Sequence, residues 1–355
     1  MERKHNRRIG MSQQPLLSRI EDPMQFLSYL EYLYNSENKL NWENFYKKLR
    51  TPTDAIEFSH SRQNPHYAIK IINNIGYPKL VVVMPTPDLH NRITKDTISR
   101  FGNTCIVLVE SSGKYFNFAK SMNIGIQQAL QLDPKWILLS NNDVYPIDNI
   151  EKFEFSLKKY QPVASVPVLN EPHIIRPIIT KWFEPSYTEQ QLMKIISYPA
   201  ELLGLSGSLI SNLVASRYKI FKSDAITRFL ELDNMVLNSI VYQSPISGML
   251  KRVSDSLKSK GKYLVSYINI QPVGIFAPYI LEEFNFDETF INHGEDSDLS
   301  IRMKLNDIDI SSIKITFGGS ASASLGLANS RMYRCTLFGL LYMGFKLKNI
   351  YKIAD

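Results

Sequence analysis

Three carboxylates lie close together in the stretch 292–303. Glu295, Asp296 and Asp298 follow Gly294, and Arg302 comes four residues after Asp298. A carboxylate can act as a general base that takes a proton from a reacting hydroxyl group, and burial or a neighbouring carboxylate raises its pKa toward the range where it does so well. This stretch is therefore a candidate for proton transfer. The spacing of Asp298 and Arg302 predicts an ion pair on one face of a helix.

A structural interpretation of the same stretch stays open. Acidic side chains are favoured at helix N-termini, where they cap backbone amides and complement the helix dipole. By that interpretation none of the three carboxylates is catalytic. The same electrostatics would stabilise the ionised form and weaken Asp296 as a base, unless burial or Glu295 raises its pKa.

A second candidate for chemistry is the sequence Asn141-Asn142-Asp143, which follows the apolar run 136–140. Mg²⁺ and Mn²⁺ prefer oxygen ligands and often keep several waters, so Asp143 could hold such a cation together with the phosphates of a ligand. Without that ligand a single carboxylate makes a weak cage. Taken alone, Asn-Asn-Asp is also an ordinary turn after a strand.

Short apolar runs predict the elements that would position these residues. Residues 80–84, 105–109 and 136–140 are typical of buried parallel strands, and a helix is predicted over 119–130. Each of the three runs ends in a polar segment. Since ligands of such sheets bind at the carboxyl ends of the strands, the polar segments should lie together around a ligand.

The order of these segments resembles that of family 2 glycosyltransferases with the GT-A fold. The matching segments are Pro85-Thr86, Glu110-Ser111-Ser112, residues 117–125, Asn141-Asn142-Asp143, residues 284–290 and the acidic stretch 292–303. Asn-Asn-Asp stands in the place of the metal-binding DxD, in the form found among rhamnosyltransferase-like members. The resemblance covers roughly residues 79–170 and 271–325 and depends on the order of the segments more than on any one motif.

The resemblance implies an α/β, GT-A-like (Rossmann-like) fold with a mixed, mostly parallel sheet flanked by helices. It also implies an inverting glycosyltransferase that moves a sugar from a nucleotide-diphosphate sugar to an acceptor hydroxyl. By position in the family motif, Asp296 is the expected base, with Glu295 beside it, and Asp143 is expected to hold Mg²⁺ or Mn²⁺ once the donor is bound. The residues expected to bind the donor are Pro85, Thr86, Glu110, Ser111, Lys120, Asn123 and Asn142.

The sequence departs from the family pattern after the acidic helix. Many relatives carry a histidine near the end of the next strand, where it can join the metal site. Here the predicted strand 313–317 runs into Gly318-Gly319-Ser320 instead. This glycine and serine segment fits a loop on the phosphate side. Metal affinity is expected to be low or to depend on the bound donor, and a metal-independent mechanism stays open.

Three regions are predicted along the chain. Residues 1–76 form a helical N-terminal extension, in which apolar residues such as Leu30 and Leu33 recur at helical spacing. Residues 77–325 form the glycosyltransferase domain, with an acceptor-side insertion at 170–270. Residues 326–355 form a C-terminal helical segment.

Composition limits the classes of function. The chain of 355 residues carries a net charge of +7, which suits a nucleotide-diphosphate donor, anionic headgroups or nucleic acid. Nucleic acid is an unlikely partner, because no recognition motif accompanies the charge. No apolar run has the length of a membrane helix and the basic N-terminus lacks an apolar stretch after it, so a cytoplasmic protein is expected. Cys105 and Cys335 match no zinc or redox spacing and are expected to be buried.

The apolar stretch 337–345 precedes Lys346, Lys348 and Lys352. A helix packed on the domain is the favoured interpretation. A homodimer contact and a peripheral membrane contact, with aromatic side chains inserted and lysines at the headgroups, explain the same pattern. The acceptor could accordingly be a carbohydrate, a lipid-linked sugar or a protein.

Two other classes of function stay open. A nucleotidyltransferase that builds activated sugars would carry a glycine-rich basic loop after its first strand, and residues 85–92 show neither feature strongly. A catalytically silent carbohydrate- or nucleic-acid-binding module could keep the sheet without the reaction. The single carboxylate of Asn-Asn-Asp and the missing histidine keep this second alternative open.

Overall fold

The computed structural model of the chain describes residues 23–150 except 37, 75 and 77, then 162–166, 175–178, 265–268, 270, 273–308, 310–312, 317–319 and 329–351. Most of the predicted insertion at 170–270 lies outside these residues.

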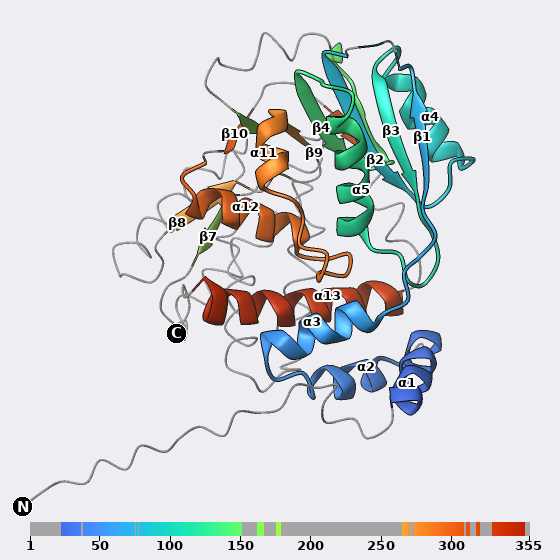
Figure 1. Ribbon diagram of the computed structural model, residues 1–355, viewed down its shortest axis with the longest axis vertical. Coiled ribbons are helices and arrows are strands. Elements are labelled where there is room, and N and C mark those ends of the chain that lie inside the picture. The colour runs from blue at the N-terminus through green and yellow to red at the C-terminus, as the bar shows by residue number, and fades with distance from the viewer. Residues whose placement is uncertain are drawn as a thin grey trace, which may run out of the picture.

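The described residues form an α/β structure around a mixed sheet of seven strands in the order β1-β3-β2-β4-β9-β6-β10 (Figure 1). Its strands are β1 (Ala68–Ile72), β2 (Leu80–Thr86), β3 (Cys105–Glu110), β4 (Trp136–Ser140), β6 (Val163–Ser165), β9 (Val273–Phe276) and β10 (Ile310–Ser312). The pairs β2–β3, β2–β4 and β6–β10 are parallel, whereas β1–β3, β4–β9 and β6–β9 are antiparallel. The prediction of a mixed sheet flanked by helices is confirmed. Five of its seven strands point the same way, and β1 and β9 run against them.

The three predicted central strands and the helix after the second are confirmed as β2, β3, β4 and α5 (Phe118–Leu130). Every residue of β2 is buried, as expected for a strand covered on both faces. Val81 and Val83 pack on the α5 side of the sheet, while Val82 and Met84 pack on the other side with Phe101, the residue that caps α4 (Arg92–Arg100). Pro85 and Thr86, which follow the predicted strand 80–84, are the last two residues of β2.

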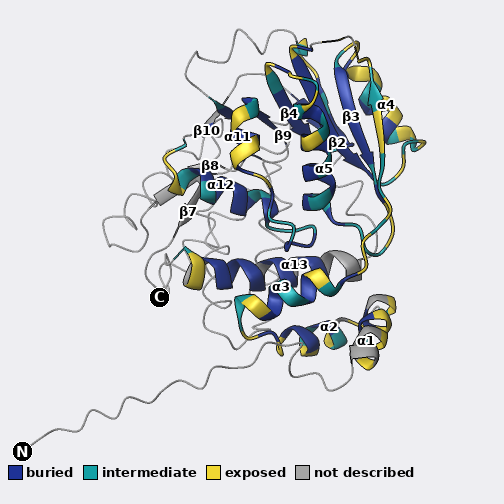
Figure 2. Cartoon of the chain, in the orientation of Figure 1, coloured by how far each residue is buried: buried dark blue, intermediate teal, exposed yellow. Residues whose placement is uncertain are grey.

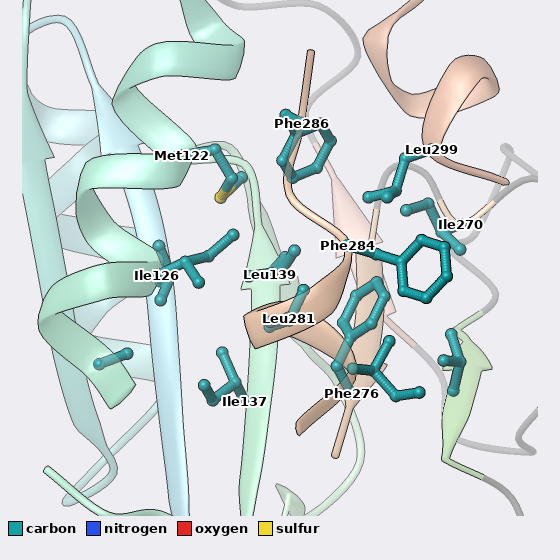
Figure 3. Close-up of a cluster of buried hydrophobic side chains, with 14 of the residues drawn as sticks. Met122, Ile126, Ile137, Leu139, Ile270, Phe276, Leu281, Phe284, Phe286 and Leu299 are labelled. Carbon is teal, nitrogen blue, oxygen red and sulfur yellow. The ribbon is translucent and has the colours of Figure 1, made fainter. Parts of the chain in front are cut away.

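A cluster of apolar side chains joins α5 and β4 to the later part of the chain (Figure 3). Met122 and Ile126 of α5 lie beside Leu139 of β4, and Leu281 of α11 (Pro278–Glu283) packs into the same cluster. The residues after α11 continue the contact through Phe284 and Phe286. This cluster holds the start of α12 (Glu295–Leu305) in place relative to the sheet, because Leu299 of α12 belongs to it.

Three helices lie within the predicted N-terminal extension: α1 (Pro23–Asn35), α2 (Lys39–Tyr46) and α3 (Pro52–Ser61). α3 begins with a capping box, in which the Thr51 hydroxyl accepts from the Asp54 amide at 3.1 Å and the Thr51 amide donates to the Asp54 carboxylate at 3.1 Å. Residues 68–72 of the same region form β1 and pair with β3. The sheet therefore begins before the predicted boundary at 77, since the isoleucine-rich run Ala68–Ile72 suits an edge strand.

The C-terminal helix α13 (Asn329–Phe345) lies across α2 and α3 and continues into the π-helical turn η4 (Lys346–Ile350) (Figure 1). Phe338 and Tyr342 are buried against Tyr46 and Phe58 of the N-terminal helices. The packed-helix interpretation is confirmed, as the buried colouring of α13 in Figure 2 shows. These aromatic side chains are not available to insert into a membrane, and Lys346, which the membrane interpretation placed at the headgroups, is itself buried.

Two small antiparallel sheets complete the described structure. β5 (Val144–Pro146) pairs with β11 (Phe317–Gly319), and β7 (Ile175–Ile178) pairs with β8 (Val265–Ile268). Residues 313–316 of the predicted strand lie outside the described residues, and Phe317 begins β11. Cys105 and Cys335 are buried, as predicted, and neither forms a disulfide among the described residues. Among the helices that the structure describes, none has the length and apolar character needed to cross a bilayer.

Candidate functional site

The carboxyl ends of β2 and β3 meet through their backbones. The Ser111 amide donates to the Thr86 carbonyl at 2.9 Å, so the chain leaves the two strands side by side. The Glu110 carboxylate accepts from the Leu89 amide at 3.1 Å, which ties the loop after β2 to the end of β3. The predicted donor-binding residues Pro85, Thr86, Glu110 and Ser111 are thus brought together at one edge of the sheet.

The turn after β4 is joined to this edge by a buried polar cluster. Asn142 donates through Nδ2 to Thr94 Oγ1 at 3.1 Å and to Thr86 Oγ1 at 3.5 Å, and the two threonine hydroxyls lie 3.0 Å apart. Because these side chains bond to one another, Thr86 and Asn142 fix the relative positions of two strand ends. Thr94, in α4, was not predicted to belong to the site. Nothing in its sequence context distinguishes it from any threonine in a surface helix.

Two buried polar atoms at this edge have no hydrogen-bond partner. They are the hydroxyl oxygen of Ser111 and the side-chain carbonyl oxygen of Asn141, which comes directly before Asn142. Buried polar atoms are nearly always paired, so two unpaired atoms at the ends of β3 and β4, the strands on either side of β2, indicate an edge where a polar ligand can bind. Asp143 is only 5% exposed and follows in the same turn.

The donor atoms in this turn fit part of a hard-cation site. Asp143 brings a carboxylate and Asn141 an unpaired side-chain oxygen, both ligands that Mg²⁺ accepts. In the part of the chain that the structure describes, no group of three or more histidine, cysteine, aspartate or glutamate residues could hold a metal ion. A cation here would need further oxygen ligands, such as the phosphates of a bound nucleotide.

The small sheet β5–β11 brings the segment after the acidic helix next to the turn that contains Asp143. Gly319 pairs with Val144, the residue that follows Asp143, and Gly318 pairs with Tyr145. A Cβ atom on Gly318 would lie 2.8 Å from the ring of Tyr145, so a side chain at this position would displace that ring. Gly318 and Gly319, predicted to lie in a loop, form a strand, because the missing side chains allow this close contact.

The N-terminus of α5 is joined to the segment before α12 by hydrogen bonds in both directions. Asn117, the N-cap of α5, donates through Nδ2 to the carbonyls of Glu288 at 2.9 Å and Phe290 at 3.1 Å. Asn292 accepts from the Phe118 amide at 2.7 Å and donates to the Phe116 carbonyl at 3.0 Å. Asn117 and Asn292, which were not predicted as site residues, therefore hold the start of α5 against the segment before α12.

Two predicted donor-binding residues on α5 bond within the protein. Asn123 donates to the Phe286 carbonyl at 2.9 Å and to the Glu288 carboxylate at 3.0 Å, and it accepts from the Phe286 amide at 2.9 Å. The half-buried Lys120 donates to the Asn64 side chain at 2.8 Å. In this structure Asn123 supports the segment before α12, and the Lys120 ammonium contacts the linker between α3 and β1.

The acidic helix begins where the sequence predicts it. Gly294 precedes Glu295 with a φ of 95°, a left-handed conformation that suits glycine. Glu295 is buried, and its Oε2 atom has no hydrogen-bond partner. Burial, reinforced by the neighbouring charge of Asp296, raises the pKa of Glu295 to about 8. The first carboxyl of the helix is therefore protonated at neutral pH, the reverse of what the helix dipole alone would favour. Asp296 is half-buried beside it.

The predicted ion pair between Asp298 and Arg302 is confirmed, with Nε and Oδ2 2.9 Å apart. Asp298 is fully buried, and Lys346 of η4 also donates to it at 2.7 Å. The hydroxyl of Tyr351 donates to the same carboxylate. Asp287, in the segment before α12, accepts from Lys346 at 2.7 Å and from Tyr342 at 2.9 Å. From the sequence, Lys346 was named only as a headgroup contact in the membrane interpretation, and its pairing with the two aspartates was missed, because a lysine after an apolar stretch is usually solvated.

No model of a known protein family matches this chain, and a search of curated proteins likewise finds no match.

Proposed function

We propose that this protein is an inverting glycosyltransferase of the GT-A kind, which moves a sugar from a nucleotide-diphosphate sugar to an acceptor hydroxyl. The donor would bind at the carboxyl ends of β2, β3 and β4, and the acceptor at the start of α12.

The observation that carries this proposal is the position of the unpaired buried atoms. Among the described residues, five buried side-chain atoms have no hydrogen-bond partner, and three of them are Ser111 Oγ, Asn141 Oδ1 and Glu295 Oε2. Each leaves a buried polar group unsatisfied, at a cost of roughly 1–3 kcal/mol. All three lie in segments that the family resemblance assigns to donor or acceptor. A polar ligand at each of these segments would remove that cost.

The proposed reaction is a single displacement. The acceptor oxygen attacks the anomeric carbon, a new carbon–oxygen bond forms, and the bond from that carbon to the diphosphate breaks with both electrons leaving on the diphosphate. Asp296 takes the acceptor proton as the bond forms. Because Glu295 is protonated near neutral pH, it adds no second negative charge beside Asp296.

Asp143 and Asn141 would hold Mg²⁺ or Mn²⁺ together with the donor. The cation would offset the negative charge that develops on the leaving diphosphate. The backbone contact between Ser111 and Thr86 keeps the polar ends of β2 and β3 adjacent, so both can face one donor.

The experiment is a panel of UDP-, GDP- and dTDP-sugars with Mn²⁺, Mg²⁺ or chelator, in which the unfolding temperature and slow donor hydrolysis are measured. A specific donor at 100 times its Kd stabilises the native state by about 2.7 kcal/mol. We expect a metal-dependent stabilisation by one donor class that Asp143→Ala abolishes. Asp296→Asn should keep that stabilisation and lose transfer. Asp133→Asn, at an exposed turn with a φ of 49° that asparagine accepts readily, is the matched control.

Three results separate the possible functions. Unchanged turnover in Asp296→Asn would remove that residue from the role of base. Binding of a sugar nucleotide without turnover would favour a catalytically silent carbohydrate-binding module. The side chains of Thr86 and Asn142, which bond to each other, fit that function as well. No stabilisation by any donor would contradict the proposed transferase.

A further inference from the structure

Lys346 joins two carboxylates that lie on either side of the acidic pair. Its ammonium group donates to Asp287 Oδ2 and to Asp298 Oδ1, each at 2.7 Å. Glu295 and Asp296 lie within the segment 287–298 that these two contacts delimit. One cation from the C-terminal end of the chain therefore contacts both ends of the segment proposed to activate the acceptor.

The contacts of Lys346 are buried and strong. Its side chain is 5% exposed and that of Asp298 is fully buried. Charge-assisted hydrogen bonds of this length are about twice as strong as neutral ones, and the loss of one partner leaves a buried charge uncompensated. The site contains two carboxylates and two cations, since Arg302 also pairs with Asp298. Lys346 is the only one of the two cations that reaches Asp287 in the described contacts.

Each carboxylate also has a partner that does not depend on Lys346. Asp298 keeps Arg302, and Asp287 keeps the Tyr342 hydroxyl at 2.9 Å and the Thr289 amide at 3.0 Å. Loss of the lysine should therefore loosen the segment without detaching α12. What is lost is the direct bridge between Asp287 and Asp298, because no other described side chain bonds to both. Weaker, indirect links stay: Tyr342 and Tyr351 each contact one of the two aspartates, and Arg302 joins Asp298 to the Asn285 carbonyl.

We infer that Lys346 is a positioning residue that sets the geometry of the segment 287–298, so that the C-terminal helix forms part of the scaffold of the proposed acceptor site. The inference rests on the proposed transferase function for its catalytic consequence. Its structural consequence, a segment clamped at both ends by one ammonium group, is independent of any donor.

The test compares Lys346→Met, which keeps the length of the side chain and removes its charge, with Lys346→Arg, which keeps the charge. Lys95→Met, at an exposed position of α4, is the control. Backbone amide hydrogen exchange reports local opening, and the amides of Thr289, Phe290 and Asp298 are bonded within the segment. We expect exchange of these amides to become at least about tenfold faster in Lys346→Met, while amides of the β2–β3 ladder keep their rates.

Turnover provides the second readout. With a donor identified, kcat should fall about tenfold or more in Lys346→Met while the donor KM stays unchanged, and Lys346→Arg should recover most of kcat. Loss of folded protein alone would also lower the apparent kcat at an unchanged KM, so kcat is calculated per mole of folded enzyme; a merely structural role would then leave kcat unchanged. If the wild type turns over no donor, the proposed function fails, and the exchange rates still decide whether Lys346 positions the segment.

Two results would overturn the inference: unchanged exchange at the three amides, or equal acceleration there and in the β2–β3 ladder. Should Lys346→Met not fold, Asp287→Asn tests the same clamp from its more exposed end. It should accelerate exchange at Thr289 and Phe290 and leave the Asp298 amide, which donates to the Gly294 carbonyl at 2.9 Å, unchanged.

Discussion

Replacement of Glu295 by glutamine should remove most of a pH dependence of stability that burial of this carboxyl creates. The pKa of Glu295 rises from an ordinary value of 4.5 to about 8 in the folded protein, first because the carboxyl is buried and then because Asp296 is charged. Below the unfolded pKa the carboxyl is protonated in both states. As the pH rises further, the unfolded chain loses the proton and the folded chain keeps it, so the unfolding free energy falls until the folded pKa is passed.

The size of the effect follows from the interval between the two pKa values. Each pH unit in this interval lowers the unfolding free energy by about 1.4 kcal/mol, so the full interval is worth as much as about 5 kcal/mol. Glutamine has a similar shape and does not titrate. The difference in unfolding free energy between Glu295→Gln and the wild type should therefore grow with pH from 4.5 to 8.

The assay is urea denaturation of the wild type, Glu295→Gln and Glu283→Gln at pH steps from 4.5 to 8.5. Glu283 lies exposed in α11 and is the matched control, whose curve should run parallel to that of the wild type. A gap that widens by at least about 2 kcal/mol across this range would agree with the buried, protonated carboxyl. Parallel curves for Glu295→Gln and the wild type would refute the reasoning, because they would mean that the carboxyl ionises in the folded protein as it does in the unfolded chain.

Two further substitutions test the packing around the acidic helix. Asp298→Asn should lower the unfolding free energy, measured by urea denaturation, by about 3–5 kcal/mol, because it leaves two largely buried cations without this charged partner. The control Asp96→Asn, in the exposed pair with Arg92, should change the unfolding free energy by less than about 1 kcal/mol. Equal losses in the two variants would contradict this. Gly339→Ala should cost about 1–3 kcal/mol, because its methyl group would lie 2.2 Å from the His293 carbonyl oxygen, and an unchanged unfolding temperature would show that α13 does not approach His293 so closely.

The sequence was sufficient to predict the elements that carry a strong local pattern. The runs 80–84, 105–109 and 136–140 are strands because valine, isoleucine and leucine pack on both faces of a buried sheet. The acidic helix was likewise predictable, since Gly294 and three carboxylates mark a helix start. The grouping of the polar residues was also predictable, because parallel strands that end at one edge of a sheet bring the residues after them together.

The direction of a side chain at the site was not predictable from residue type. Asn123 and Asn142 stand where donor-binding residues are expected, yet the amide of each bonds to the protein. Asparagine offers both a donor and an acceptor, so it serves a ligand or a neighbouring loop equally well. Which of these it does depends on loops distant in sequence, such as the segment 284–292 against α5, and no local pattern encodes that contact.

The protonation of Glu295 shows why local electrostatics and tertiary structure had to be weighed together. A carboxylate at a helix N-terminus gains roughly 0.3–1 kcal/mol from the dipole, which would lower its pKa. Full burial acts in the opposite direction and can shift a pKa by several units. Burial dominates here. Gly339 lets α13 approach the turn at His293 and Phe290 packs against Tyr342, so α13 lies against the turn that precedes α12. We therefore expect that removing the packing at Gly339 and Tyr342, more than forty positions after Glu295, would lower the pKa of Glu295 toward the ionised state that the helix dipole favours.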